Sequence, residues 1–305
     1  MARRRSADRG SGPPRVALVT DSTASLPCDW ITEHEVTVVP LQVVIGATAY
    51  DEGVPGGVTA SVLADALKSW TPVSTSRPNP EAFLAIYQAL GKHHDEIVSI
   101  HISGELSGTF ESAQLAAAQA SVPVHVVDSH QVGIATGFAV MAAQEARAAG
   151  LDGAAIAAAA ESQGLRSTTL LYVDTLEYLR RGGRVGATAA LLGSALAVKP
   201  ILAMENGRLV PRERVRTATK ALARLQELAV AAAADGPCRV AVAHLANPDK
   251  AEHLAAGLGA ALGESLVDEV VVGEIGAVLG AHVGPGMVAV CVAPINEPQS
   301  PAPHG

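Results

Sequence analysis

Short runs rich in valine and isoleucine alternate with helical patterns through the first half of the chain. The runs are VALVT, VTVVPLQVVI, EIVSIHI and VHVV, and the helical patterns cover residues 80–90, 109–120 and 133–149. Strands that are apolar throughout are typical of a parallel sheet, which is buried on both faces. The alternation therefore predicts an α/β domain in which helices flank a parallel sheet.

A different pattern follows the alanine-rich segment 154–160. Strand-like runs are joined there both by helices and by a hairpin, whose Asn206-Gly207 pair suits a tight turn. This arrangement predicts a mixed or antiparallel sheet with helices on it. We therefore expect an N-terminal α/β domain over residues 15–165 and a C-terminal α/β domain over residues 166–295. The ends, residues 1–14 and 296–305, are expected to be disordered.

Composition narrows the classes of partner. The net charge is −8 and aromatic residues make up only 3%, which argues against nucleic acid, since binders of single strands stack bases on exposed rings. Three cysteines without a CxxC pair suggest a reducing, cytoplasmic location. The histidines lack metal-ligand spacing, so no metal and no cofactor are expected. No apolar stretch is long enough to span a bilayer, so membrane contact is transient at most.

The segment ISGELSGTFES takes a predicted strand into a helix through small polar residues. Ser107 lies beside Gly108 and Thr109 at the start of that helix, with Ser103 a few residues earlier. Backbone N–H groups at a helix N-terminus, with a hydroxyl beside them, suit a carboxylate or a phosphate. Ordinary helix capping explains the same residues equally well.

Three further segments have local chemistry that suits an anion. VSTSRPNP is predicted to be a loop in which Pro80 begins a helix. GAHVGPG is predicted to be a turn from which His282 projects, and a histidine against a carboxylate would be protonated and donate a hydrogen bond. LRRGGRVG, with the later arginines 212, 214 and 216, concentrates positive charge in an acidic chain. Each segment has an ordinary structural explanation when taken alone.

The order of these segments resembles the DegV family of fatty-acid-binding proteins, which act with a bacterial fatty acid kinase. The motifs are TDSTASLP, VVPLQVVIGATAYDEG, TSRPNPEAF, ISGELSGTFESA, VVDS, LEYLRRGGRVG, KPIL, VRTATKAL and GAHVGPG. Together they extend over residues 16–294, nearly the whole chain. The resemblance implies a protein that holds a long-chain fatty acid and presents it for phosphorylation in phospholipid synthesis, without catalysing that step itself.

The resemblance also implies roles for particular residues. Thr75, Ser107 and His282 match the family's carboxylate-binding residues. Residues placed near this cluster are Ser76, Ser103, Gly108 and Thr109. Arg184 and Arg216 match positions associated with engaging the kinase. Residues 50–72 are expected to pack on the second domain.

Two departures from the family pattern and one rival function accompany this interpretation. Gly104 follows Ser103 where the family often has a second serine, and Arg77 replaces a glutamine. The rival is a lipid or ester hydrolase with Ser107 as nucleophile and His282 as base, oriented by Asp21 or Asp128. The segment around Ser107 lacks the glycine pattern of a nucleophile elbow, which counts against that function.

Overall fold

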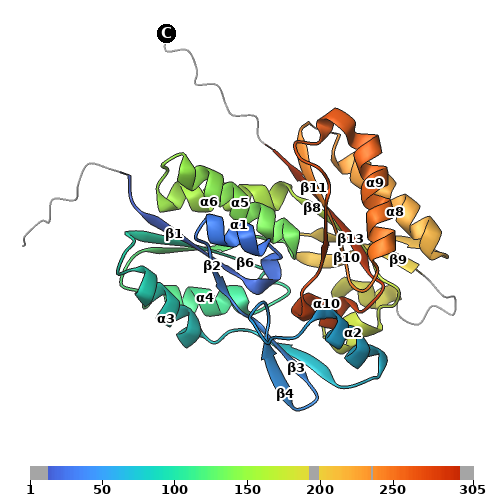
Figure 1. Cartoon of the computed structure of the whole chain (residues 1–305), viewed down its shortest axis with the longest axis horizontal. Helices are drawn as coiled ribbons and strands as arrows, with labels where there is room; N and C mark the ends of the chain where they lie inside the picture. The colour runs from blue at the N-terminus through green and yellow to red at the C-terminus, as the bar shows by residue number, and fades with distance from the viewer. Residues whose placement is uncertain (1–12, 192–198, 235, 296–305) are drawn as a thin grey trace, which may run out of the picture.

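A computed structural model describes residues 13–191, 199–234 and 236–295. The first sheet has four parallel strands in the order β2-β1-β6-β7. Their bounds are Thr37–Val39 (β2), Val16–Asp21 (β1), Glu96–His101 (β6) and Val124–Asp128 (β7). This is the parallel sheet that the valine- and isoleucine-rich runs predict (Figure 1).

Helices cover both faces of the parallel sheet, because successive side chains of each strand point to opposite faces. Ala17 and Val19 pack under α3 (Pro80–Leu90) and α4 (Thr109–Ala117). Leu18 and Ile100 pack under α5 (Ile134–Ala148) and α6 (Gly153–Arg166). The short helix α1 (Cys28–Glu33) follows β1. The central strands β1 and β6 are therefore buried on both faces, whereas the edge strands β2 and β7 are partly buried.

The second sheet has six strands in the order β10-β9-β8-β13-β11-β12 and is antiparallel except for the β11-β12 pair. Its strands are β8 (Thr168–Tyr172), β9 (Lys199–Glu205), β10 (Arg208–Val215), β11 (Cys238–His244), β12 (Val271–Glu274) and β13 (Val288–Pro294). Helices α8 (Ala218–Ala232) and α9 (Pro248–Leu262) pack on one face. Asn206 and Gly207 join β9 to β10 with φ of +50° and +78°, as a tight hairpin turn requires. The α/β class with a parallel and a mixed sheet is confirmed.

The predicted run VTVVPLQVVI divides between two sheets. Residues before Pro40 form β2, whereas the residues after it form β3 (Gln42–Ile45). β3 pairs antiparallel with β4 (Thr48–Asp51) and β5 (Val73–Ser76) in a separate three-stranded sheet. A proline has no N–H to donate, which favours a break in the ladder at this point. The prediction of a loop over VSTSRPNP is wrong at its start, because Thr75 lies in β5.

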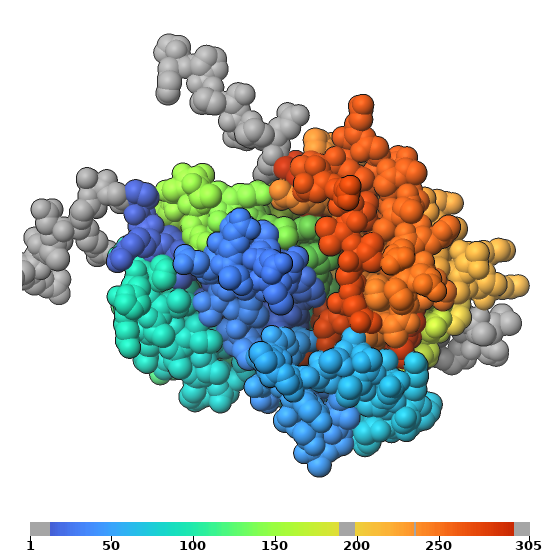
Figure 2. Space-filling view, in the orientation of Figure 1, coloured from blue at the N-terminus to red at the C-terminus, as the bar shows by residue number. Residues whose placement is uncertain are grey.

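The small sheet and helix α2 (Ala60–Lys68) pack against elements of the C-terminal half. Val43 of β3 and Leu63 of α2 share a core with Val173, Leu245 and Val278. In Figure 2 the light-blue segment that contains these elements lies against the orange and red part of the chain. The packing brings β5 beside helix α10 (Ala277–Val283).

The terminal segments predicted to be disordered lie outside the described residues, apart from residues 13 and 14. Among the helices of the described part, none is long and apolar enough to cross a membrane.

Candidate functional site

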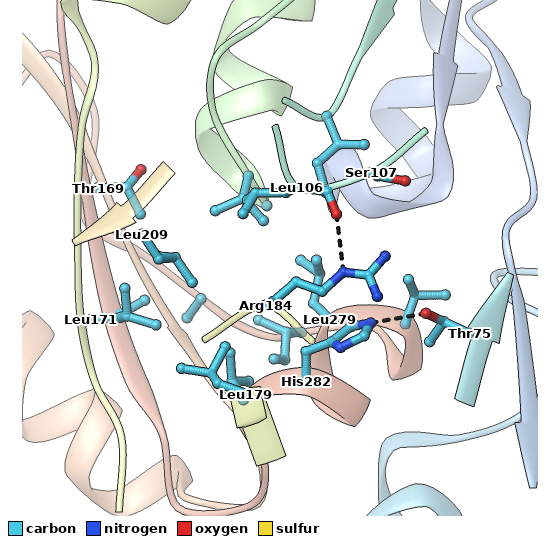
Figure 3. Close-up of a pocket in the computed structure, with 18 of the residues that line it drawn as sticks. Thr75, Leu106, Ser107, Thr169, Leu171, Leu179, Arg184, Leu209, Leu279 and His282 are labelled. Carbon is cyan, nitrogen blue, oxygen red and sulfur yellow. Dashed lines mark hydrogen bonds between the residues drawn. The ribbon is translucent and has the colours of Figure 1, made fainter. Parts of the chain in front are cut away.

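An apolar cavity of about 400 Å³ lies between the parallel sheet, the six-stranded sheet and α10. Its volume falls within the range of small-molecule sites in proteins, roughly 300–1,000 Å³. Leu171 of β8 and Ala289 of β13 form part of the floor, while Leu106 precedes α4 and Leu279 belongs to α10. Residues from distant parts of the chain therefore line one largely aliphatic space (Figure 3).

Polar side chains converge at one end of the cavity. Thr75 Oγ1 lies 2.8 Å from His282 Nε2, which joins β5 to α10 across 207 residues of sequence. Ser107 lines the same cavity. In Figure 3 Thr75 and Ser107 lie on the right with His282 beside Thr75 near the centre, whereas Thr169 and Leu171 lie on the left. The structure thus brings Thr75, Ser107 and His282 to one cavity.

His282 occupies the last turn of α10 rather than the turn predicted for GAHVGPG. The helix ends at Gly284, whose φ of +76° lies in the left-handed region that favours glycine. A Cβ at Gly284 would lie 2.0 Å from the ring of Tyr178, so the position also requires a residue without a side chain. Gly284 therefore ends the helix directly after Val283, the residue that follows His282.

Ser107 lies at the N-terminal end of α4. Its Oγ lies 2.9 Å from Thr109 Oγ1 and accepts a hydrogen bond from the Thr109 N–H at 3.3 Å. Gly108 is the residue that caps the helix, and it supplies no side-chain hydrogen bond. The backbone donors and the hydroxyl expected from the sequence are therefore present together at this end of the cavity.

Burial governs the charge of His282. Burial, with a further contribution from the nearby Arg184 guanidinium, lowers the pKa of His282 to about 4. The ring is therefore neutral near pH 7. Protonation of a ring that is held against a carboxylate, as expected from the sequence, stays a prediction. Among the described residues, His282 Nδ1 is buried and has no hydrogen-bond partner.

The two arginines that the resemblance assigns to a kinase lie in different places. Arg184 lines the cavity, where its Nε donates to the Leu106 carbonyl oxygen at 3.1 Å and its Nη1 donates to that of Gly182 at 2.7 Å. Arg216 is exposed between β10 and α8, away from the cavity lining. Its role at a partner surface stays a prediction.

The residues predicted to lie near the cluster divide into two groups. Ser76 and Gly108 line the cavity. Ser103 is buried and donates to the Gly207 carbonyl oxygen at 2.8 Å, and Thr109 is buried behind Ser107. Neither of these two forms part of the cavity lining.

Both departures from the family pattern lie near the site. Arg77 lines the cavity and pairs with Glu111 at 2.7 Å, which holds its guanidinium at the rim. Gly104 donates its N–H to Asp128 Oδ2 at 3.1 Å, so this position contributes a backbone donor to the turn before Ser107.

The geometry required of a hydrolase is not formed around His282. Within the described part of the chain, neither Asp21 nor Asp128 bonds to its ring, and Ser107 is bonded to Thr109 instead. A Ser-His-Asp arrangement exists elsewhere: His101 lies 2.7 Å from Ser99 Oγ and 2.9 Å from Asp21 Oδ2.

That second arrangement is sealed. Ser99, His101 and Asp21 are all fully buried, and the Tyr87 hydroxyl donates to Ser99 Oγ at 2.8 Å. Asp21 also accepts a hydrogen bond from the Ile102 N–H at 3.1 Å. A nucleophile must be reachable by its substrate, and Ser99 is not. The hydrogen bonds of this network instead connect β1 to the end of β6.

One residue that positions the site was missed by sequence reasoning. Glu52 is buried, and its two carboxylate oxygens accept from the Val278 N–H at 2.8 Å and the Ser22 hydroxyl at 2.6 Å. Burial raises the pKa of Glu52. The carboxylate joins β4 to the first turn of α10, which carries His282. No local signal predicts a contact between residues 226 positions apart.

Comparisons with known proteins agree along nearly the whole chain. A family model described as "Uncharacterised protein, DegV family" matches residues 15–294. A DegV domain-containing protein of Streptomyces coelicolor is 49% identical over 279 residues, which cover 91% of this chain and 98% of that protein.

Solved structures show the same fold. A fatty-acid-binding DegV family protein from Thermus thermophilus matches with a TM-score of 0.86 and 32% identity, covering 92% of this chain and all of the other. DegV from Bacillus subtilis, described as a fatty acid binding protein, matches with a TM-score of 0.84 and 33% identity over 92% of this chain and 99% of the other. The chain therefore belongs to the DegV family.

Proposed function

We propose that this protein binds a long-chain fatty acid, with the acyl chain in the apolar cavity and the carboxylate at Thr75, Ser107 and His282. The observation that carries the proposal is the charge pattern of the cavity. The charged residues of its described lining are Arg77 and Arg184, and none of the described lining residues is acidic, although the chain carries a net charge of −8. An aliphatic space that ends in cationic and hydroxyl groups suits an amphiphile with an anionic head.

The resemblance in structure supports the same ligand. The relatives from Thermus thermophilus and Bacillus subtilis are both described as fatty-acid-binding proteins. Their identities of 32% and 33% over almost the entire chain make a shared ligand class the simplest proposal.

Magnitudes assign different tasks to the two ends of the ligand. Each buried methylene contributes about 0.8 kcal/mol, so a sixteen-carbon chain gains on the order of 10 kcal/mol before ordering costs are subtracted. A hydrogen bond to a charged group contributes about 1.5–3 kcal/mol. The acyl chain therefore supplies most of the affinity, and the polar cluster selects the carboxylate and fixes its position.

Native mass spectrometry of the purified protein tests this proposal. We expect a protein peak that carries the mass of one fatty acid, and lipid extraction followed by gas chromatography identifies the chain. After delipidation, added palmitate restores the complex. A preparation that stays at the mass of the bare chain, both after mild purification and after palmitate is added, contradicts the proposal.

We further propose that the bound carboxylate is presented to a fatty acid kinase and that Arg216 contacts that partner. Arg216→Ala is expected to keep its bound lipid and to lose kinase-dependent phosphorylation of it. Arg214→Ala is the matched control, because Arg214 is an exposed arginine two residues away. Equal loss of phosphorylation in both variants, or loss of lipid from Arg216→Ala, would contradict the assignment.

A further inference from the structure

Arg77 lies where the cavity reaches the molecular surface, because its side chain lines the cavity and is 53% exposed. It directly follows β5, two residues after Thr75, and precedes Pro78, which favours an extended backbone at Arg77. The side chain reaches the start of α4, where its Nη1 donates to the Gly108 carbonyl oxygen at 3.4 Å. The guanidinium therefore lies between β5 and α4, beside Ser107.

The absence of a side chain at Gly108 allows this close contact. A Cβ at Gly108 would lie 2.0 Å from Arg77 Nη1 and 2.9 Å from Cζ. The φ of Gly108 is −73°, a value that any residue adopts, so the backbone conformation does not require glycine here. The approach of the guanidinium accounts for the glycine instead.

One edge of the Arg77 guanidinium is unused. Its Nη1 donates to Glu111 Oε2 at 2.7 Å, whereas Nε and Nη2 have no hydrogen-bond partner among the described residues. Nε and Nη2 share one edge of the planar group, and a pair of parallel N–H donors matches the two oxygens of a carboxylate. Glu111 therefore holds the guanidinium in place and leaves this pair of donors free.

The other groups of the site supply a carboxylate with little positive charge. Thr75 and Ser107 carry neutral hydroxyls, and burial lowers the pKa of His282 to about 4, which leaves its ring neutral near pH 7. Arg184 is charged, but its Nε and Nη1 both donate to backbone carbonyl oxygens. Of the two arginines in the described lining, only Arg77 therefore has a free pair of donors on one edge.

We infer that Arg77 is a further head-group residue, whose Nε and Nη2 donate to the two carboxylate oxygens from the solvent side of the cluster. The inference rests on the proposed function, because it requires a fatty acid in the cavity. Arg77 replaces a glutamine of the family pattern, so this contact distinguishes the chain from relatives that keep the glutamine. The class of ligand that Arg77 selects is an acyl chain with an ionised head group, in preference to one with an uncharged head group.

Equilibrium dialysis of delipidated protein with radiolabelled palmitate and hexadecanol tests the inference, since the two ligands share a sixteen-carbon chain and differ in charge. Arg77→Gln is expected to weaken palmitate binding by about 3- to 10-fold, less than the loss of a fully buried charged hydrogen bond because the guanidinium is half exposed. Hexadecanol binding should change by less than about 2-fold, because the alcohol has no charge to pair with Arg77.

Arg180→Gln is the matched control. Arg180 is 54% exposed and pairs with Glu177, much as Arg77 pairs with Glu111, but it does not line the cavity. Its replacement should leave the binding of both ligands within about 2-fold. Arg77→Lys keeps the charge without the pair of parallel donors, so its palmitate affinity should lie between those of the wild type and Arg77→Gln.

The outcomes separate the inference from the proposed function. An equal effect of Arg77→Gln and Arg180→Gln on palmitate, or equal weakening of palmitate and hexadecanol by Arg77→Gln, would overturn the role of Arg77. A lysine variant that binds palmitate no better than the glutamine variant would also overturn it. Failure of the wild-type protein to bind palmitate at all would instead overturn the proposed function.

Discussion

The neutral imidazole of His282 makes the cluster of Thr75, Ser107 and His282 sensitive to pH in a defined direction. The lowered pKa, about 4 against an ordinary value of 6.5, means that the unfolded chain takes up a proton between these pH values that the folded chain does not. The free energy of unfolding therefore decreases as the pH falls from about 6.5 to about 4. A bound carboxylate opposes this effect, because an adjacent negative charge raises the pKa of the ring.

We predict that His282→Gln removes this dependence in delipidated protein. The free energy of unfolding of the wild type, relative to that of the variant, should fall by on the order of 1–2 kcal/mol between pH 7 and pH 5. Urea denaturation at both pH values measures the difference. His253→Gln, at an exposed histidine of α9, is the control and should track the wild type. A constant difference between wild type and His282→Gln would contradict the predicted shift.

At the scale of single residues, the sequence predicts which side chains the site contains better than it predicts which residues they contact. The hydroxyl and helix N-terminus at Ser107 follow from local pattern, because capping is decided within a few residues. The Thr75–His282 hydrogen bond joins residues 207 positions apart, so only resemblance to a family could suggest it. The place of Arg184 inside the cavity had no local signal, since its position depends on a turn packed against Leu106.

Helix α10 is the element on which the site depends, and the Glu52 carboxylate holds its first turn. Burial raises the pKa of Glu52 above its ordinary value of 4.5. The contribution of this group to the free energy of unfolding is therefore lost as the pH rises from that ordinary value through the raised pKa. The same carboxylate accepts two hydrogen bonds that keep α10 in place. Its removal should therefore affect His282 at the other end of the helix.

We predict that Glu52→Ala lowers the free energy of unfolding by about 2–4 kcal/mol and weakens palmitate binding, because hydrogen bonds to a buried carboxylate are lost. Glu52→Gln should restore both properties to within about 1 kcal/mol, since its carbonyl oxygen still accepts from Val278. Chemical denaturation, calorimetry and the NMR signal of His282 provide the measurements. Asp51→Ala, at the neighbouring exposed carboxylate, is the control. Glu52→Ala with unchanged palmitate binding would limit Glu52 to a structural role.

Helices whose first residues include a proline can be predicted from the sequence, whereas the short strands of the small sheet cannot. Helices α3 and α9 begin at Pro80 and Pro248, each after an asparagine, as expected for a first helical position. The three-stranded sheet was missed because its strands are four residues long and β5 pairs with β3 across some thirty residues. Such pairing is decided by tertiary packing, which local propensity does not contain.

At the scale of the whole molecule, the cavity is built from both large sheets, so ligand and fold should be coupled. A ligand that binds only the folded chain stabilises it by RT ln(1 + [L]/Kd), which is about 2.7 kcal/mol at one hundred times Kd. We predict that palmitate raises the free energy of unfolding of delipidated protein by about this amount and that methyl palmitate, which lacks the charge, does so less. Urea denaturation measures both, and equal stabilisation by the two ligands would contradict carboxylate recognition.

The described lining of the cavity has no carboxylate although the chain carries a net charge of −8, and this also affects how quickly a fatty acid arrives. At long range an anion is repelled, and only within about a Debye length of the opening do the arginines dominate. Added salt screens the repulsion, so uptake of a fatty acid should be faster at 0.15 M salt than at 0.01 M. An anionic bilayer would be repelled by the same field, which favours brief encounters with a membrane over residence on it.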